Sequence, residues 1–400
     1  FQAEDGIRDL VRSRGLGDVY KRQIISRSRE SNMNIQLMDR VATDQKIKLA
    51  IADCDIHPTP KSVAVEIYPY LSKRWQDYME TYGIIYRQGF PTGPAFPKGQ
   101  PNAARRDAYP PGGGKPGSDL DFMRSQHLDP NNVQLGILNP LSCGQGVQNQ
   151  DFSAAYCNAV NHWQIAEWTS KESRLKASLM VPYEDPSASV KEIDLWGGDS
   201  NFAQILLLSR TAEPLGQRKY WPIFEAACRA NLPVAVHAFG YGGAPVTGSG
   251  WPSFYIEEMV GHAENTQSLL TSMVFEGVFE RFPTLKLILV EAGFAWLPAL
   301  SWRLDKLWNR MRDEIPHVTR PPSELIRQHV WLTTQPMEEP EPRVHLLDTI
   351  EWIGWEKLLF ATDYPHWDFD EPSRALPIRV GKEQKEAFFL KNALELYNLN

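Results

Sequence analysis

Residues 202–238 read FAQILLLSRTAEPLGQRKYWPIFEAACRANLPVAVHA, and this stretch decides the fold class. It begins with a largely apolar run, Phe202–Ser209, and ends with a second one, Leu232–Ala238. The apolar residues in both runs stand next to one another and do not alternate with polar ones, as in a parallel strand that is buried on both faces. Between the runs, Tyr220–Ala230 has the apolar periodicity of a helix. The stretch therefore predicts a strand, a helix and a second, parallel strand.

The same pattern recurs along the rest of the chain. Further runs of strand length are Lys48–Asp55, Asn132–Asn139, Arg174–Val181, Leu285–Glu291, His329–Gln335 and Lys357–Asp363. Segments with helical periodicity accompany them at Ala154–Trp168, Asn265–Phe279 and Lys382–Leu396. Strand and helix repeated eight times predict an α/β fold of the (β/α)₈ TIM-barrel type. A doubly wound open sheet is the alternative, because a count of strands does not show that the sheet closes.

The predicted barrel domain spans residues 48–399, with an insertion at about 60–130 after the first strand. Part of this insertion, Arg87–Ser118, is dense in Pro and Gly, which is typical of a lid, a binding loop or an oligomer arm. We expect residues 24–47 to be an N-terminal extension. Residues 1–23, FQAEDGIRDLVRSRGLGDVYKRQ, resemble translated sequencing-adapter sequence, and we expect a native start at Met33 or Met38. A genuine amphipathic helix is the alternative for residues 1–23.

The amino-acid composition argues against some classes of function. A net charge of −7 and a pI near 5.8 argue against a nucleic-acid partner. No apolar run approaches the ~18 residues of a membrane span, so no membrane partner is expected. The four cysteines, Cys54, Cys143, Cys157 and Cys228, are scattered, which predicts reduced thiols in a cytoplasmic protein. The thirteen Trp favour aromatic-lined pockets or interfaces.

Polar residues that could bind a metal stand at the ends of the predicted strands. Asp55 ends the first run and His57 follows it, two positions away and thus on the same side of an extended segment. His237 lies near the end of the fifth run, Glu291 ends the sixth and Asp363 ends the eighth. Active sites of such barrels lie where the carboxyl ends of the strands meet. Two imidazoles and two carboxylates would suit one divalent metal, Zn²⁺ or Mn²⁺.

Three motifs carry a resemblance to a known family: DCDIHP at 53–58, VAVHA at 234–238 and FATDYPHWD at 360–368. Over about residues 48–399 the chain resembles the amidohydrolase-related group of the amidohydrolase superfamily. That group contains aminocarboxymuconate-semialdehyde decarboxylase, gamma-resorcylate decarboxylase and carboxyvanillate decarboxylase. The resemblance implies a distorted (β/α)₈ barrel with one metal, held by Asp55, His57, His237 and Asp363. It also implies a homodimer, since the family often dimerises.

The chain departs from the group's pattern in two places. The first-strand motif is HxH or ExH in the group, whereas Asp55-Ile-His57 is a DxH version. Many relatives carry a catalytic His at the end of strand six, where this chain has Glu291. A carboxylate can accept a proton or hydrogen-bond a water, but it cannot act as a cationic imidazolium. A mechanism that depends on this imidazolium therefore does not carry over to this chain.

Most of the further candidates have one functional and one structural interpretation. Asp363 is a candidate proton carrier or else a cap of the turn that follows it, Glu291 a proton shuttle or a partner of Arg303, and His366 a pocket residue or a surface residue. Arg105 and Arg106 are candidate ligands for a substrate carboxylate or else solvated loop charges. The residues Trp251, Tyr255, Trp296 and Trp367 are candidates for lining a pocket for a planar ring or else for packing in the core. Gln335 is a candidate orienting group.

Two reactions fit such a site. We favour a metal-dependent carboxy-lyase that acts on a small molecule, an aromatic or muconate-like carboxylic acid, without oxidation. The acidic first-strand ligand, Asp55, resembles the decarboxylases' version of the motif, and the aromatic residues could hold a planar acid. A metal-dependent hydrolase of a lactone, amide or ester is the first alternative. A non-catalytic barrel that only binds a partner is the second.

Overall fold

The computed structural model describes residues 49–83, 103–141, 143–240 and 245–399, apart from the side chain of Cys143 and the burial of Gly146. The predicted segments 1–23 and 24–47, and residues 84–102 of the predicted insertion, lie outside the described residues. The compact unit that contains the barrel spans Lys48–Asn400.

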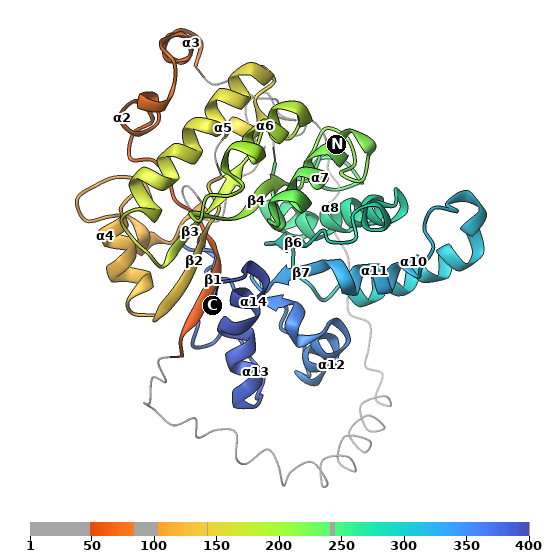
Figure 1. The fold of residues 1–400 in the computed structure, drawn as a ribbon. Helices are drawn as coiled ribbons and strands as arrows, with labels where there is room; N and C mark the ends of the chain where they lie inside the picture. The colour runs from red at the N-terminus through yellow and green to blue at the C-terminus, as the bar shows by residue number, and fades with distance from the viewer. Residues whose placement is uncertain (1–48, 84–102, 142, 241–244, 400) are drawn as a thin grey trace, which may run out of the picture. The chain divides into compact units, whose positions relative to one another are not determined.

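Eight strands form one sheet in the order in which they occur along the chain, and each neighbouring pair is parallel (Figure 1). The strands are β1 (Ile51–Ile56), β2 (Val133–Leu138), β3 (Leu175–Met180), β4 (Phe202–Leu208), β5 (Val234–His237), β6 (Leu287–Val290), β7 (Val330–Thr333) and β8 (Leu358–Leu359). Apart from the last residue of β1, each lies within its predicted run. The strand predictions are therefore confirmed.

The sheet closes on itself between β1 and the segment that follows β8. The amide of Cys54 donates to the carbonyl of Phe360 at 3.0 Å, and Ile56 forms a parallel bridge with Tyr364. The prediction of a (β/α)₈ barrel is thus confirmed, and the open doubly wound sheet is excluded.

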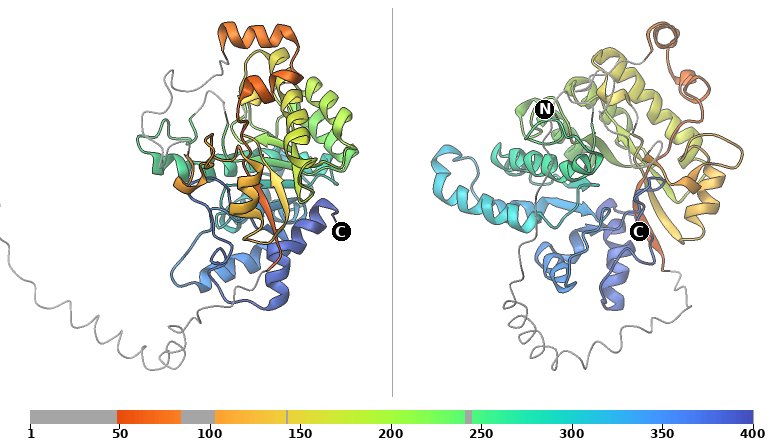
Figure 2. Two further views of the ribbon diagram at one scale, coloured as in Figure 1. Left: turned by 90° about the vertical axis from the view of Figure 1, so that its left-hand side faces the viewer. Right: turned by 180° about the vertical axis from the view of Figure 1, so that it is seen from behind.

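Helices surround the strands (Figures 1 and 2). They are α2 (Val63–Glu66), α3 (Lys73–Tyr82), α4 (Leu120–Met123), α5 (Gln150–Gln164), α6 (Pro186–Trp196), α7 (Trp221–Ala230), α8 (Tyr255–Phe275), α9 (Val278–Arg281), α10 (Leu297–Met311), α11 (Pro322–His329), α12 (Val344–Ile353), α13 (Lys382–Glu386) and α14 (Asn392–Tyr397). Short 3₁₀ or π segments are η1 (Tyr68–Tyr70), η3 (Arg106–Ala108), η4 (Arg124–Leu128), η5 (Cys143–Gly146), η6 (Ile165–Thr169), η7 (Arg218–Tyr220), η8 (Arg312–Glu314), η9 (Trp355–Lys357) and η10 (Ala387–Lys391).

One predicted helix has different bounds in the structure. The prediction was Asn265–Phe279, but α8 begins ten residues earlier, at Tyr255, and ends at Phe275. The physical reason for the early end is Gly277, whose φ of 82° is left-handed and separates α8 from α9. The extra N-terminal turns of α8 carry residues that reach the pocket described below.

The core has two parts. The larger cluster lies between strands and helices, and a smaller one joins apolar side chains of six strands to α14. The smaller cluster includes Ile137, Leu206 and Ile288 from the strands and Tyr397 from α14, whose hydroxyl donates to Gln204 at 2.8 Å. Since these strand residues alternate with ones that pack against the helices, they occupy the inside of the barrel.

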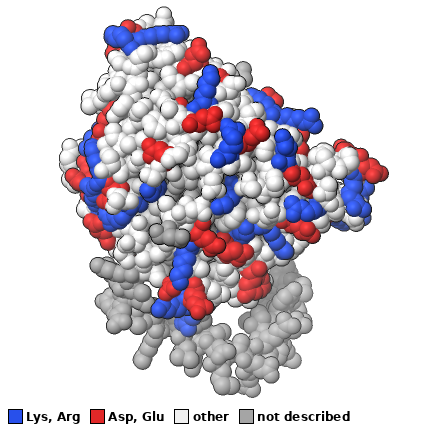
Figure 3. All heavy atoms as spheres, viewed as in Figure 1, with Lys and Arg blue, Asp and Glu red and all other residues white. Residues whose placement is uncertain are grey.

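The described surface carries no extended region of one charge in the view of Figure 3, where acidic and basic side chains are interspersed. Among the helices of the described residues, none is both long enough and apolar enough to span a bilayer.

Candidate metal centre

Ionisable side chains from four strand ends meet at one end of the barrel. Asp55 lies in β1 and His57 directly follows that strand, while His237 is the last residue of β5. Glu291 directly follows β6, and Asp363 lies four residues after β8. Asp55, His237 and Asp363 are fully buried. The barrel therefore assembles a polar cluster from segments that are far apart in the sequence.

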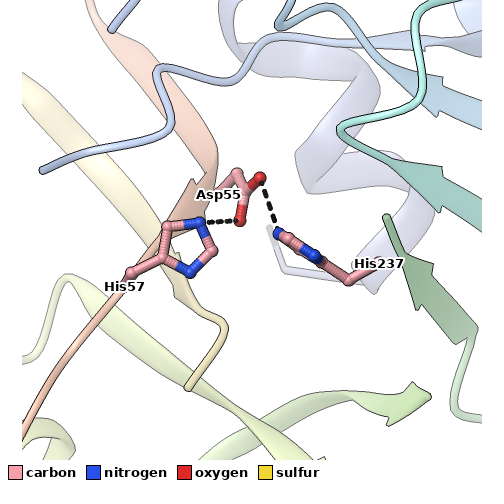
Figure 4. Close-up of side chains that lie close together, drawn as sticks. All are labelled: Asp55, His57 and His237. Carbon is pink, nitrogen blue, oxygen red and sulfur yellow. Dashed lines mark ion pairs between the residues drawn. The ribbon is translucent and has the colours of Figure 1, made fainter. Parts of the chain in front are cut away.

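Backbone carbonyls orient the two imidazole rings. Nδ1 of His57 donates to the carbonyl of Asn139 at 2.7 Å, and Nδ1 of His237 donates to the carbonyl of Ala238 at 2.8 Å. Both Nε2 atoms face the carboxylate of Asp55, at 3.2 Å for His57 and 3.4 Å for His237 (Figure 4). A hydrogen bond to one ring nitrogen fixes the tautomer that offers the other nitrogen to a metal.

Three buried atoms of the cluster have no hydrogen-bond partner among the described residues: Asp55 Oδ2, His237 Nε2 and Asp363 Oδ2. Buried polar atoms in proteins are nearly always paired, and a metal ion or an ordered water would supply the partner that no group of the described residues provides here. Ligand atoms of Asp55, His57 and His237 lie within 4.8 Å of one another. Imidazole nitrogens combined with carboxylate oxygens are a donor set for Zn²⁺ or Mn²⁺. The residues present therefore fit one divalent cation.

Burial and mutual charge shift the pKa values of the cluster. Burial would lower the pKa of His57, but the carboxylate of Asp55 and the hydrogen bond with Asp363 outweigh it and raise that pKa to about 10. Burial raises the pKa values of Asp363 and Glu291 well above their ordinary range and lowers the pKa of His237. Metal binding to such ligands displaces protons. In the metal-free protein a proton on His57 would take the place of the cation's charge.

Glu291 belongs to this cluster. Its Oε2 lies 3.2 Å from Nε2 of His237, and its side chain is 12% exposed. Its amide donates to the hydroxyl of Thr333 at 3.0 Å. Arg303, which the sequence offered as an alternative, structural partner of Glu291, is exposed on α10. The structure therefore places Glu291 beside a candidate metal ligand.

His366 connects the cluster with its surroundings. Its Nδ1 lies 2.6 Å from Oδ1 of Asp363, and Nε2 of His57 lies 2.7 Å from the same oxygen. The rings of His366 and His57 stack with their centroids 4.3 Å apart. His366 is 18% exposed, whereas Asp363 is fully buried. His366, which also lines the pocket described below, thus lies in contact with the buried carboxyl group of Asp363.

A pocket opens beside the cluster. Its lining residues are Ala103, Leu141, Ala238, Phe239, Tyr255, Glu258, Met259, His262, Glu291, His366, Trp367 and Asp368. Two aromatic residues named from the sequence, Tyr255 and Trp367, are in this wall, with ring centroids 6.3 Å apart. The indole of Trp367 donates to the hydroxyl of Tyr255 at 3.2 Å. These two rings form an aromatic side of the pocket.

The two predicted arginines are not among the described residues that line the pocket. Arg105 forms an ion pair with Asp107 at 2.7 Å, and its guanidinium lies 4.4 Å from the ring centroid of Phe369. Arg106 is exposed in η3. Arg105 therefore already has an anionic and an aromatic partner within the protein.

Three further candidates also lie outside the described pocket wall. Trp251 is 39% exposed, and the indole of Trp296 donates to the carbonyl of Ala292 at 2.9 Å. Gln335 is fully buried and donates to the carbonyl of Asp368 at 3.2 Å. Since Asp368 lines the pocket, Gln335 contacts a residue of its wall.

Sequence reasoning missed Asn139, which follows β2. Its side-chain amide donates to Asp55 at 2.9 Å, and its carbonyl accepts from His57. Its side-chain oxygen accepts from Ser178 at 2.6 Å and from Gln204 at 3.0 Å. The sequence did contain a signal for Asn139, because it stands at the end of a predicted strand, as do the candidate metal ligands.

Three pocket residues on α8 were also missed: Glu258, Met259 and His262. Together with Tyr255 they are spaced by three, four and seven positions, so they share one face of the helix. That spacing is visible in the sequence, but the prediction began the helix at Asn265 and so excluded them.

Comparison with known proteins agrees with this fold. The model of a family described as "Amidohydrolase" matches residues 52–399. A gamma-resorcylate decarboxylase from Polaromonas sp. is 25% identical over 302 residues, which cover 70% of this chain and 88% of the relative. A 2-amino-3-carboxymuconate-6-semialdehyde decarboxylase from Dictyostelium discoideum is 25% identical over 251 residues, or 61% of this chain and 66% of the relative.

Solved structures share the architecture. A 5-carboxyvanillate decarboxylase from Novosphingobium aromaticivorans, in complex with manganese and a nitrobenzoic acid, is similar with a TM-score of 0.67 and 18% identity, covering 90% of this chain and 99% of the other. A 2,6-dihydroxybenzoate decarboxylase from Rhizobium gives a TM-score of 0.61 at 17% identity, covering 88% and 99%. The family match spans most of the chain and agrees with the barrel found here. This chain belongs to the amidohydrolase family.

Proposed function

We propose that this enzyme is a metal-dependent carboxy-lyase that removes CO₂ from an aromatic or muconate-like carboxylic acid without oxidation. The observation that carries the proposal is the cluster of Asp55, His57, His237 and Asp363, which adjoins a pocket with an aromatic side. The relatives described above are named as decarboxylases, which supports this choice of reaction.

One divalent ion, Mn²⁺ or Zn²⁺, would be held by His57 and His237 through Nε2 and by Asp55 and Asp363 through carboxylate oxygens. When bound, the ion supplies positive charge that polarises the oxygens of the substrate. Manganese in a related structure favours Mn²⁺ as the first metal to test.

Asp363 is the proposed proton donor. Its carboxyl group would protonate the ring carbon that bears the substrate carboxylate, which makes that carbon tetrahedral. The bond to the carboxylate then breaks, CO₂ leaves, and the electron pair of that bond restores the ring. His366, 2.6 Å from Asp363 Oδ1, would return a proton from the pocket side.

The pocket residues have proposed binding roles. Tyr255 and Trp367 would lie against the planar part of the substrate, because aromatic rings pack well against planar groups. Glu291 would accept a hydrogen bond from a substrate hydroxyl or from a bound water, since its side chain lines the same pocket. Gln335 would hold the wall through Asp368.

Hydrolysis of a lactone, amide or ester is the second candidate. The observation that favours it is Glu291, a carboxylate 3.2 Å from His237 at the position where many decarboxylases of the group have His. A carboxylate placed there could take a proton from an attacking water.

The test is a substrate screen of the manganese-loaded protein. Hydroxybenzoates and muconate-like acids are assayed for CO₂ release, and lactones and esters for ring opening or acid release. We expect CO₂ from at least one acid, whereas turnover of lactones with no CO₂ from any acid would replace the lyase by the hydrolase. Absence of both stoichiometric metal and turnover would favour a barrel that only binds a partner.

Asp363→Asn tests the proton role. The variant should lose nearly all activity, about 10²–10⁴-fold as for loss of a general acid, while it keeps much of its bound metal. The control is Glu192→Gln, the same type of change at a buried carboxylate on α6 that bonds to Asn158, Asn161 and Trp196. Full activity in Asp363→Asn would refute the assignment.

The predicted homodimer, the cytoplasmic location and the absence of nucleic-acid partners stay predictions. Light scattering of the purified chain would measure its oligomeric state.

A further inference from the structure

Asp363 stands in an unusual backbone conformation. Its φ is 62°, in the left-handed region that side-chain-bearing residues seldom adopt. Such conformations persist where surrounding interactions impose them, and they cluster at functional sites. Something in the structure must therefore fix the neighbouring residues, Thr362 and Tyr364.

Asp53, a fully buried residue of β1, makes the contacts that fix Thr362. Its Oδ1 accepts from the amide of Thr362 at 2.9 Å, and its Oδ2 accepts from the hydroxyl of Thr362 at 2.5 Å. The same Oδ1 accepts from the amide of Asp55 at 3.2 Å. The carboxylate of Asp53 thus accepts hydrogen bonds from the amide of one candidate ligand, Asp55, and from the amide of the residue before the other, Asp363.

His127, from η4 of the insertion, completes these contacts. Its Nε2 donates to Asp53 Oδ2 at 2.7 Å, and its Nδ1 accepts from the side-chain amide of Asn131 at 3.1 Å. Because Asn131 donates to Nδ1, the neutral ring carries its proton on Nε2 and can donate to the carboxylate.

The residue after Asp363 is held by the same group. The ring of Tyr364 stacks on His127, with centroids 4.7 Å apart and planes 5° from parallel. The amide of Tyr364 donates to the hydroxyl of Thr362 at 3.2 Å, and its own hydroxyl donates to Gln126 at 2.9 Å. Both neighbours of Asp363 are therefore fixed by contacts that lead back to Asp53 and His127.

We propose that Asp53 is a positioning residue for the metal centre, acting through Thr362 on Asp363 and through the amide of Asp55. It is not itself a ligand, because its two oxygens already accept four hydrogen bonds. The inference rests on the metal site of the proposed function, but not on which reaction that site performs.

Asp53→Asn is the informative change because it keeps the shape of the side chain. Its one oxygen can still accept from the amides of Thr362 and Asp55. Its NH₂ group, however, would face the Nε2–H of His127, which is a donor, and could no longer accept from the hydroxyl of Thr362. The variant therefore loosens the segment around Asp363 without opening a cavity.

The experiment measures the affinity of the metal-free chain for Mn²⁺ by calorimetry, without substrate. We expect Asp53→Asn to bind Mn²⁺ about 10–100-fold more weakly, the usual loss when a residue that supports metal ligands is changed. The control is Asn161→Leu, which removes two buried bonds to the backbone of Met180 on the outer side of β3. It should lower stability while leaving the affinity unchanged.

A second variant with its own control keeps the proposal testable if Asp53→Asn does not fold. Thr362→Val removes the hydroxyl bonded to Asp53, and Thr169→Val removes a buried hydroxyl that donates to Asn201 at 2.7 Å. We expect about tenfold weaker Mn²⁺ binding for Thr362→Val and no change for Thr169→Val.

Each outcome decides between the two proposals. Wild-type affinity in Asp53→Asn or in Thr362→Val would overturn the role of Asp53 and leave the proposed function in place. A wild-type chain that binds neither Mn²⁺ nor Zn²⁺ would overturn the metal site, and the proposed function with it.

Discussion

Glu172 offers a prediction about how the insertion is attached to the barrel. The residue precedes β3 and accepts from two arginines: Arg174 Nε at 2.8 Å and Arg124 Nε, from η4, at 2.8 Å. A further bond from Arg174 Nη2 measures 2.9 Å. These hydrogen bonds lower the pKa of Glu172 from 4.5 to about 2, and those from Arg174 contribute more than the one from Arg124. Replacing Glu172 by Gln removes the charge and keeps the size.

The magnitude follows from the two pKa values. At about 1.36 kcal/mol for each pKa unit, the difference corresponds to about 3 kcal/mol. We reduce this to about 2 kcal/mol because both guanidinium groups are partly exposed, 28% for Arg124 and 26% for Arg174, so that solvent screens them. The folded pKa is the lower one. The contribution is therefore complete above the unfolded pKa of 4.5 and is lost as the pH falls toward 2.

The assay compares the free energies of unfolding of wild type and Glu172→Gln in urea at pH 7 and pH 3. We expect a difference of about 2 kcal/mol at pH 7 and less than half of it at pH 3. The control, Glu167→Gln, removes an exposed ion pair with Lys171 and should cost under about 0.5 kcal/mol. An equal difference at both pH values would refute the electrostatic reasoning. No difference at either pH would refute the idea that Glu172 attaches the insertion to the barrel.

Two further predictions concern the metal and Arg105. Removal of the metal with a chelator should lower the melting temperature, and Mn²⁺ at a hundred times its Kd should return about 2.7 kcal/mol of stability; an unchanged melting temperature would contradict the site. Arg105→Ala should change KM less than about threefold, because Arg105 is paired with Asp107 and stacked on Phe369. A KM raised tenfold or more would restore the substrate-binding role that the sequence predicted for it.

The barrel and the ends of its strands could be predicted because both depend on local patterns. An apolar run of strand length is visible in any sequence, and parallel strands place their carboxyl ends at one end of a barrel. His237 and Glu291 stand at such ends, so their proximity to each other followed from the topology alone.

Asp53 shows what a local pattern cannot reveal. Strict alternation would place Asp53 and Asp55 on the same side of β1. The pairing of β1 with β2 instead changes register between Asp53 and Ile56. Asp53 meets His127 while Asp55 faces His237. Such an irregularity arises from the contacts of a strand with its neighbours, which the sequence of that strand does not encode by itself.

Two carboxylates of the site share a feature that connects the fold with its chemistry. Glu291 and Asp363 both have left-handed backbones, with φ of 54° and 62°. Each such residue costs about 1–3 kcal/mol, and glycine would avoid most of that cost. Both residues stand where the chain leaves the barrel, and both carboxylates have pKa values raised by burial. Conformation and desolvation therefore both oppose a carboxylate at these positions, and stability alone would favour other residues. A bound cation would offset the desolvation, which makes the metal the simplest single reason for both residues to be acidic.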